Sequence, residues 1–105
     1  MSQHDLIIHQ PPTANQLVLL FHGVGSSAAN LVPLGKALVS MLPQATIVSV
    51  QGPEAMGPGW QWFSVNGVTE ANRPSRVAAA LPSYLEAIHR WQAAGALIAE
   101  NTTLI

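Results

Sequence analysis

Two short, mainly apolar runs constrain the fold of this chain more than any other feature. Residues 16–21 read Gln-Leu-Val-Leu-Leu-Phe and residues 45–50 read Ala-Thr-Ile-Val-Ser-Val, with turn-forming residues near the ends of both. A strand with one solvated face alternates apolar and polar residues, whereas a strand of a parallel sheet is covered on both faces and is apolar almost throughout. Both runs therefore predict buried strands of a parallel sheet.

Segments with helical spacing separate these strands. Leucines recur at this spacing from Leu31 until Pro43 ends the pattern. A second helix is predicted from about Pro74 to Ala94, with Gly95 as its C-cap signal. One face of this second helix carries Val77, Leu81, Leu85, Ile88 and Trp91.

The remaining strand candidates lie at the two ends of the chain. Residues 6–8 predict an edge strand, because two prolines follow closely at positions 11 and 12. Residues 102–105 predict the opening of a third buried strand. Strands that alternate with helices indicate an α/β fold with a mostly parallel sheet, and we expect one domain over residues 1–105.

The charge content excludes several classes of protein. Only 9% of the residues are charged, the net charge is −1, and the chain has no cysteine. A nucleic-acid binder or a polybasic membrane surface would need a basic patch, and no apolar run is long enough to span a membrane. His4 and His9 lack a third ligand at metal spacing. We therefore expect no metal, no cofactor, no nucleic acid and, without a signal peptide, a cytoplasmic protein.

A glycine-rich turn, His22-Gly23-Val24-Gly25-Ser26-Ser27, carries the functional signal. It follows a buried strand and precedes a helix, and α/β proteins bind ligands at that edge of the sheet. One interpretation is an oxyanion hole, in which small residues bring backbone N–H groups close to a substrate carbonyl. The segment His22–Gly25 fits that role.

Two other interpretations of this turn stay open at this point. Gly23-x-Gly25-x-x-Ala28 satisfies a dinucleotide-binding pattern, although Gln51 stands where that pattern needs an acidic residue for the ribose. The turn could also be a tight connection that needs glycine for steric reasons alone. These interpretations give a nucleotide-binding module and a non-catalytic fragment as the rival functions.

Three segments in order resemble the phospholipase/carboxylesterase family of α/β-hydrolases, which includes acyl-protein thioesterases and small bacterial carboxylesterases. They are residues 19–25 (Leu-Leu-Phe-His-Gly-Val-Gly), the strand and Gly/Pro-containing loop from residue 47, and residues 62–65 (Trp-Phe-Ser-Val). The resemblance covers essentially the whole chain. It implies the N-terminal part of a three-layer α/β-hydrolase fold, ending just before the nucleophile elbow.

The resemblance also implies roles for individual residues. The backbone N–H of Val24 would be an oxyanion-hole donor, His22, Gly23 and Gly25 would shape the loop, and Trp62 and Phe63 would lie near the acyl-binding cleft. The family's catalytic serine, acid and base have no counterpart in residues 1–105. We therefore expect a serine esterase that acts on a small ester or thioester, and no activity from this chain alone. We also expect an exposed sheet edge that drives self-association.

Overall fold

The computed structural model describes residues 5–23, 25–56, 58–62, 69, 71–95 and 101–105. Its main sheet contains β1 (Leu6–His9), β2 (Gln16–Phe21), β3 (Ala45–Val50) and β6 (Thr102–Leu104), in the order β1-β3-β2-β6. β2 pairs in parallel with β3 and β6, and β1 pairs antiparallel with β3. The predicted parallel α/β sheet is confirmed.

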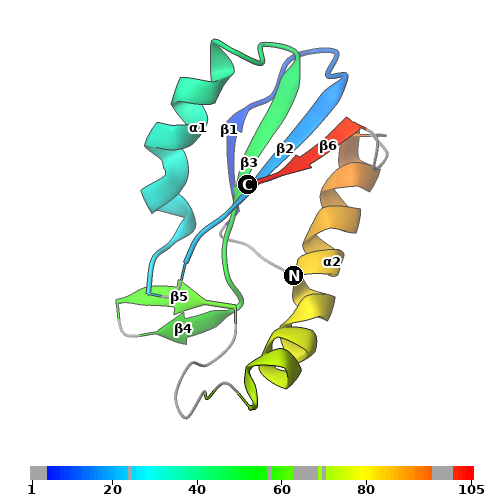
Figure 1. Ribbon diagram of the computed structural model, residues 1–105. Helices are drawn as coiled ribbons and strands as arrows, with labels where there is room; N and C mark the ends of the chain where they lie inside the picture. Colours follow the sequence, from blue (N-terminus) through cyan, green and yellow to red (C-terminus); the bar gives the residue numbers. More distant parts are fainter. Residues whose placement is uncertain (1–4, 24, 57, 63–68, 70, 96–100) are drawn as a thin grey trace.

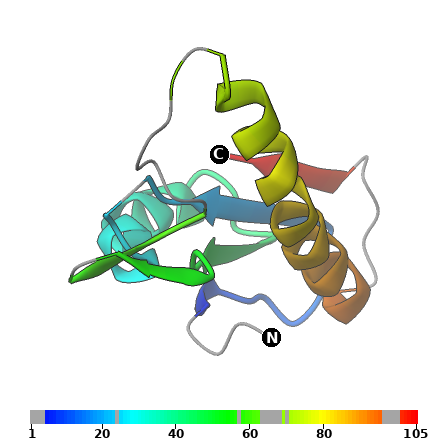
Figure 2. The ribbon, with the colours of Figure 1, turned by 90° about the horizontal axis from the view of Figure 1, so that it is seen from below.

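Helices cover the two faces of this sheet (Figures 1 and 2). A short 3₁₀ helix, η1 (Ala28–Leu31), leads into α1 (Val32–Val39) between β2 and β3, and α2 (Arg73–Gly95) precedes β6. A separate two-stranded hairpin contains β4 (Glu54–Met56) and β5 (Gly59–Gln61). In Figure 1 the hairpin lies below the sheet, at the end where the chain leaves β2 and β3.

Alternate residues of the two central strands form two separate cores. Leu17 and Leu19 of β2 pack with Val48 and Val50 of β3 and contact α2. The intervening residues of the same strands face the other way and contact η1, α1 and the residues just after it. Side chains point alternately to opposite faces of a strand, so a strand between two helical layers must be apolar at both sets of positions.

The contact face of α2 differs from the predicted one. Ala80 and Ala87 are buried, and Tyr84, Ile88 and Trp91 pack against the core. Val77, Leu81 and Leu85 were predicted to share the face of Ile88 and Trp91, but they are 41–50% exposed. The contact face of α2 is thus centred on Ala80, Tyr84 and Ala87, and Val77, Leu81 and Leu85 lie to one side of it.

The C-terminal strand also differs from the prediction. β6 lies at the edge of the sheet, and Leu104 and Ile105 are each 52% exposed. The predicted strand is present at Thr102–Leu104 and pairs in parallel with β2, and it forms the exposed sheet edge expected from the sequence, although its side chains are not buried in the structure described. β1 is the opposite edge, as predicted.

Candidate functional site

The glycine-rich loop begins where β2 ends, beside the end of β3. Phe21 is paired with Val50 in the parallel register, so both strands end at the same edge of the sheet. Parallel α/β sheets place their ligands outside this carboxyl edge. Residues 22–28 cross this edge to reach η1, and the described part of the loop makes a series of hydrogen bonds to residues 49–62.

His22 holds the first part of the loop. Its imidazole is buried, with Nδ1 2.8 Å from the Gly23 carbonyl oxygen and Nε2 2.8 Å from the Gly52 backbone nitrogen. A backbone N–H can only donate, so Nε2 accepts and the proton of the neutral ring lies on Nδ1. The carbonyl of His22 in turn accepts a hydrogen bond from Trp62 Nε1 at 3.2 Å. Both ring nitrogens are thus used in holding the loop.

The β4–β5 hairpin holds the middle of the loop. The Gly25 N–H donates to the Trp60 carbonyl, and the Trp60 N–H donates to the Ser26 carbonyl, both at 2.8 Å. These two bonds form an antiparallel bridge between Ser26 and Trp60. Gly25 has a φ of +78°, a conformation that glycine adopts without steric cost. The hairpin therefore fixes the backbone of the loop at Gly25 and Ser26.

Gly59 allows this close approach, and we expect Gly59→Ala to weaken it. A Cβ at position 59 would lie 2.1 Å from the Gly25 carbonyl oxygen and 2.8 Å from that of Ser26. The hairpin would have to move away and lose hydrogen bonds, which should lower the free energy of unfolding by about 1–3 kcal/mol in a denaturant titration. Gly23→Ala is the control, since a Cβ there meets nothing within 4 Å. Equal stability of the two variants would contradict this role of Gly59.

Side chains of β3 and the residue after it hold the last part of the loop. The Ala28 N–H donates to Gln51 Oε1 at 2.6 Å, and Ser49 Oγ donates to the Ala28 carbonyl at 2.7 Å. The N–H of Ser26 donates to the Gly23 carbonyl. The N–H groups of Gly25, Ser26 and Ala28 are therefore all satisfied by protein acceptors. A dinucleotide site would need such groups to face a pyrophosphate, so the geometry disfavours the nucleotide interpretation.

An aromatic cluster lies beside the loop. The Trp62 ring stacks on Tyr84 of α2 with centroids 4.4 Å apart, and Phe21 meets both rings edge-on at 5.3 and 5.5 Å. Trp62 is only 6% exposed. Burial raises the pKa of the Tyr84 phenol above its ordinary value of 10.0. Trp62 therefore belongs to the core and at the same time bonds the loop through His22.

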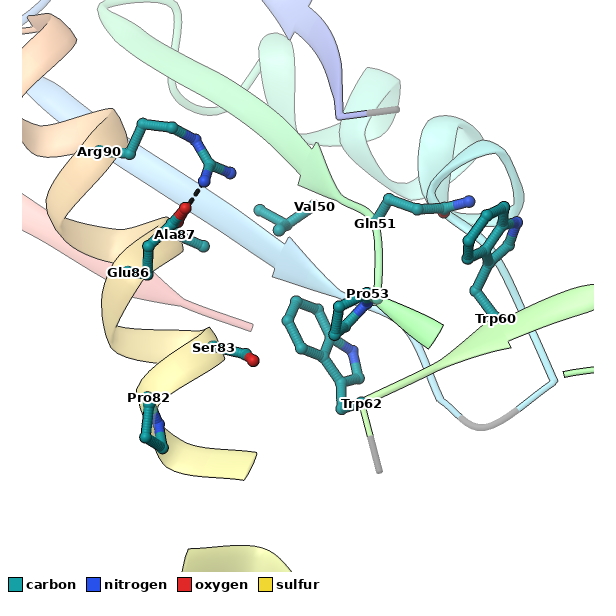
Figure 3. Close-up of a pocket in the computed structure, with 11 residues that line it drawn as sticks. Val50, Gln51, Pro53, Trp60, Trp62, Pro82, Ser83, Glu86, Ala87 and Arg90 are labelled. Atoms are coloured by element: carbon teal, nitrogen blue, oxygen red, sulfur yellow. Dashed lines mark hydrogen bonds and ion pairs between the residues drawn. The ribbon is translucent and has the colours of Figure 1, made fainter. Parts of the chain in front are cut away.

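A cleft of about 580 Å³ lies between the end of β3, α2 and the hairpin (Figure 3). Val50, Trp62 and Ala87 supply apolar surface, and Gln51 and the ion pair of Arg90 with Glu86 supply polar groups. Figure 3 shows Trp62 beside Pro53, below Val50 and across from Ser83 of α2. A cleft of this size and mixed lining is of the kind that holds a small molecule.

The structure brings together four of the six predicted site residues. His22, Gly23, Gly25 and Trp62 lie in one hydrogen-bonded region at the carboxyl edge of the sheet. Val24 and Phe63 lie outside the described residues. The loop also contacts three residues that the sequence did not assign to the site: Ser49, Gln51 and Trp60. Each bonds a loop residue 20 or more positions earlier in the chain, and no sequence pattern identifies contacts over that separation.

The described residues contain no group of three or more His, Cys, Asp or Glu side chains that could hold a metal ion. Among the described helices, none is both long and apolar enough to cross a membrane.

Known proteins similar to this chain are esterases. Residues 2–105 match the phospholipase/carboxylesterase family. Esterase YpfH of Escherichia coli (strain K12) is 42% identical over 107 residues, covering 98% of this chain and 46% of that protein. The crystal structure of esterase PE8 superimposes with a TM-score of 0.78 at 26% identity, covering 88% of this chain and 45% of that one.

A carboxylesterase from Mesorhizobium loti shares the fold at 22% identity, with a TM-score of 0.65 over 87% of this chain and 42% of that structure. The topology and these neighbours define the class: the chain has the α/β-hydrolase fold. It belongs to the phospholipase/carboxylesterase family, a family of hydrolase enzymes. The chain spans about half the length of each of these relatives.

Proposed function

We propose that the protein is a serine-dependent carboxylic-ester hydrolase in which this chain supplies the oxyanion loop. Membership of the family and the 42% identity to an esterase support the reaction class. The observation that carries the proposal is the loop at the carboxyl edge of the sheet, held through His22 on one side and through Gly25 to Ala28 on the other. Preorganised N–H donors at such a place stabilise the negative oxygen of an acyl-transfer intermediate.

The proposed reaction proceeds through an acyl-enzyme. A serine outside residues 1–105 attacks the ester carbonyl, the alcohol leaves, and water then releases the acid. In this fold one oxyanion donor follows the nucleophile and the second comes from the loop described here. We assign that second donor to the backbone N–H of Val24, the residue between Gly23 and Gly25. His22 cannot serve as the base in the observed geometry, because Gly52 occupies its Nε2.

We propose the cleft beside Trp62 as the place for the acyl or alcohol group of the ester. Its apolar residues suit a hydrocarbon portion, and it adjoins the loop through the hydrogen bond from Trp62 to the His22 carbonyl. Phe63 follows Trp62 in the sequence and is assigned to the same region. The substrate is thus a small ester or thioester with an apolar portion.

Labelling with a fluorophosphonate tests the proposed function. We expect the whole protein to hydrolyse p-nitrophenyl acetate and to lose that activity as one serine becomes labelled. Residues 1–105 contain no G-x-S-x-G sequence, so the 105-residue chain alone should neither be labelled stoichiometrically nor show saturable turnover. A whole protein without turnover or labelling would refute the proposed function, and saturable, inhibitor-sensitive turnover by the 105-residue chain would refute its assignment of the nucleophile.

A further inference from the structure

Two polar side chains in the sheet layer converge on one residue, Ala28. Ser49 is fully buried, and Gln51 is only 7% exposed. A polar group in such surroundings is costly unless it forms hydrogen bonds. Ser49 donates to the Ala28 carbonyl at 2.7 Å, and Gln51 accepts from the Ala28 N–H at 2.6 Å. Both polar groups of the Ala28 backbone are therefore engaged by side chains that lie two residues apart along the chain.

Gln51 is itself held from the other side of the sheet. Its backbone N–H donates to Asp5 Oδ1 at 2.9 Å. The second carboxylate oxygen of Asp5 accepts from Arg90 at 2.7 Å and from Trp91 Nε1 at 2.9 Å. The Asp5 side chain is 3% exposed. A continuous series of hydrogen bonds thus runs from α2 through Asp5 and Gln51 to the end of the glycine-rich loop.

Ala28 lies at the end of the glycine-rich loop, so a shift of its backbone would move the loop. It starts η1, three residues after Gly25, and its own side chain is buried. The hairpin holds Gly25 and Ser26 by hydrogen bonds, and Gln51 and Ser49 hold Ala28, two residues further along the chain. Without the Gln51 acceptor, the Ala28 N–H would be buried and unsatisfied, and the backbone would shift to find another partner.

We propose that Gln51, supported by Ser49, is a positioning residue that sets the oxyanion loop through the backbone of Ala28. This inference rests on the proposed function, because it assigns Gln51 an effect on the rate of ester hydrolysis. Gln51 also lines the cleft, but in this role its side-chain oxygen acts through the Ala28 N–H and not by contact with the reacting atoms. It acts by keeping the loop donors at the distance that the transition state requires, and misplacement of catalytic groups by about 1 Å can cost up to ~10² in rate.

Replacement of Gln51 in the whole protein tests the inference. Gln51→Met keeps the length of the side chain but removes the acceptor, and we expect kcat to fall about tenfold while KM changes less than about twofold. Gln51→Glu retains an oxygen that accepts the Ala28 N–H in either protonation state, so kcat should stay within about threefold of wild type. All rates are expressed per serine labelled at completion by a fluorophosphonate, which removes unfolded protein from the count.

Thr46→Ala is the matched control. Thr46 is also a polar residue that is only 7% exposed, but it lies near the start of β3, away from the loop. It should lower stability as Gln51→Met does and leave kcat per labelled serine unchanged. Equal losses of kcat in both variants would show general loosening of the core and overturn the inference. Unchanged kcat in Gln51→Met, or an equal loss in Gln51→Glu, would also overturn it.

Ser49→Ala extends the test if Gln51→Met does not fold. It removes the donor to the Ala28 carbonyl with the loss of one oxygen atom, and we expect kcat to fall about threefold at unchanged KM; a change below about 1.5-fold would overturn the inference. Wild-type protein that hydrolyses p-nitrophenyl acetate while these variants match it would refute the inference and leave the proposed function intact. Wild-type protein without turnover or labelling would refute the proposed function and, with it, the inference.

Discussion

Val24→Pro should lower kcat for ester hydrolysis by the whole protein by about 10²–10³, the usual cost of losing one oxyanion-hole donor. Proline has no backbone N–H, so the substitution removes the proposed donor itself. The loop on either side is held by bonds that do not involve residue 24: His22 to Gly52 before it, and Gly25 to Trp60 after it. The loss should appear in kcat with KM little changed, because the developing oxyanion interacts with the donor more strongly than the ground-state carbonyl does.

Val24→Ala is the control for this variant, since it truncates the side chain and keeps the N–H. Its kcat should stay within about threefold of wild type. Proline also restricts the residue before it, so a thermal melt must show that Val24→Pro folds. If the folded proline variant loses less than about threefold in kcat, the assignment of the donor to Val24 is wrong.

His22→Ala should destabilise the folded protein more than any other single change described here. It removes the buried acceptor of the Gly52 N–H and the ring contact to the Gly23 carbonyl. A buried donor left without a partner costs about 1–3 kcal/mol, and the lost ring leaves a cavity. We expect the free energy of unfolding to fall by about 2–4 kcal/mol in a urea titration of the whole protein.

His89→Ala provides the comparison, because His89 is exposed on α2. Its effect should lie within about 0.5 kcal/mol of zero. His22→Asn should give a loss in the free energy of unfolding between those of the other two variants, because an amide retains hydrogen-bonding groups but is shorter than the imidazole. A loss below about 1 kcal/mol for His22→Ala would mean that the two ring contacts do not hold the loop.

The sequence predicted the centre of the fold well. The structure places β2 at Gln16–Phe21 and β3 at Ala45–Val50, the same bounds as the predicted strands, and α2 at Arg73–Gly95, close to the predicted 74–94. These elements are predictable because strands covered on both faces need apolar residues at every position, and few other structures share that pattern. The glycine pattern after β2 marked the loop of interest, and the resemblance to the family favoured its interpretation as an oxyanion loop.

The face of α2 was not predictable from hydrophobicity alone. Val77, Leu81 and Leu85 repeat every four residues and are more hydrophobic than Ala80 and Ala87, yet the alanines are buried. A small residue contributes little to an apolar pattern, but its size determines how closely a helix backbone can approach a sheet. Tyr84 also stacks on Trp62. This contact depends on the shapes of the two rings and leaves no periodic pattern in the sequence.

The hydrogen bonds that hold the loop could not be predicted from the sequence either. In the sequence, Gln51 stands out only because it lacks the charge that a ribose would need, and no pattern marks Ser49. Their bonds to Ala28 join residues 21 and 23 positions apart. Such contacts follow from the register of β2 with β3 and from the path of the loop over β3, which become known only when the chain is folded.

The strand order has a consequence for how the chain folds as it leaves the ribosome. β1 pairs with β3 rather than with its neighbour in sequence, and Ile7 meets Val48, about 40 residues further on. At ~5–20 residues per second, β1 waits roughly 2–8 s after its own synthesis for its partner to be made. β2 is also complete by then, so β3 can pair with both of its neighbours as it emerges, and α1 is available to cover one face. Of the described strands of this sheet, β6 joins last, because it is made after α2 and pairs with β2.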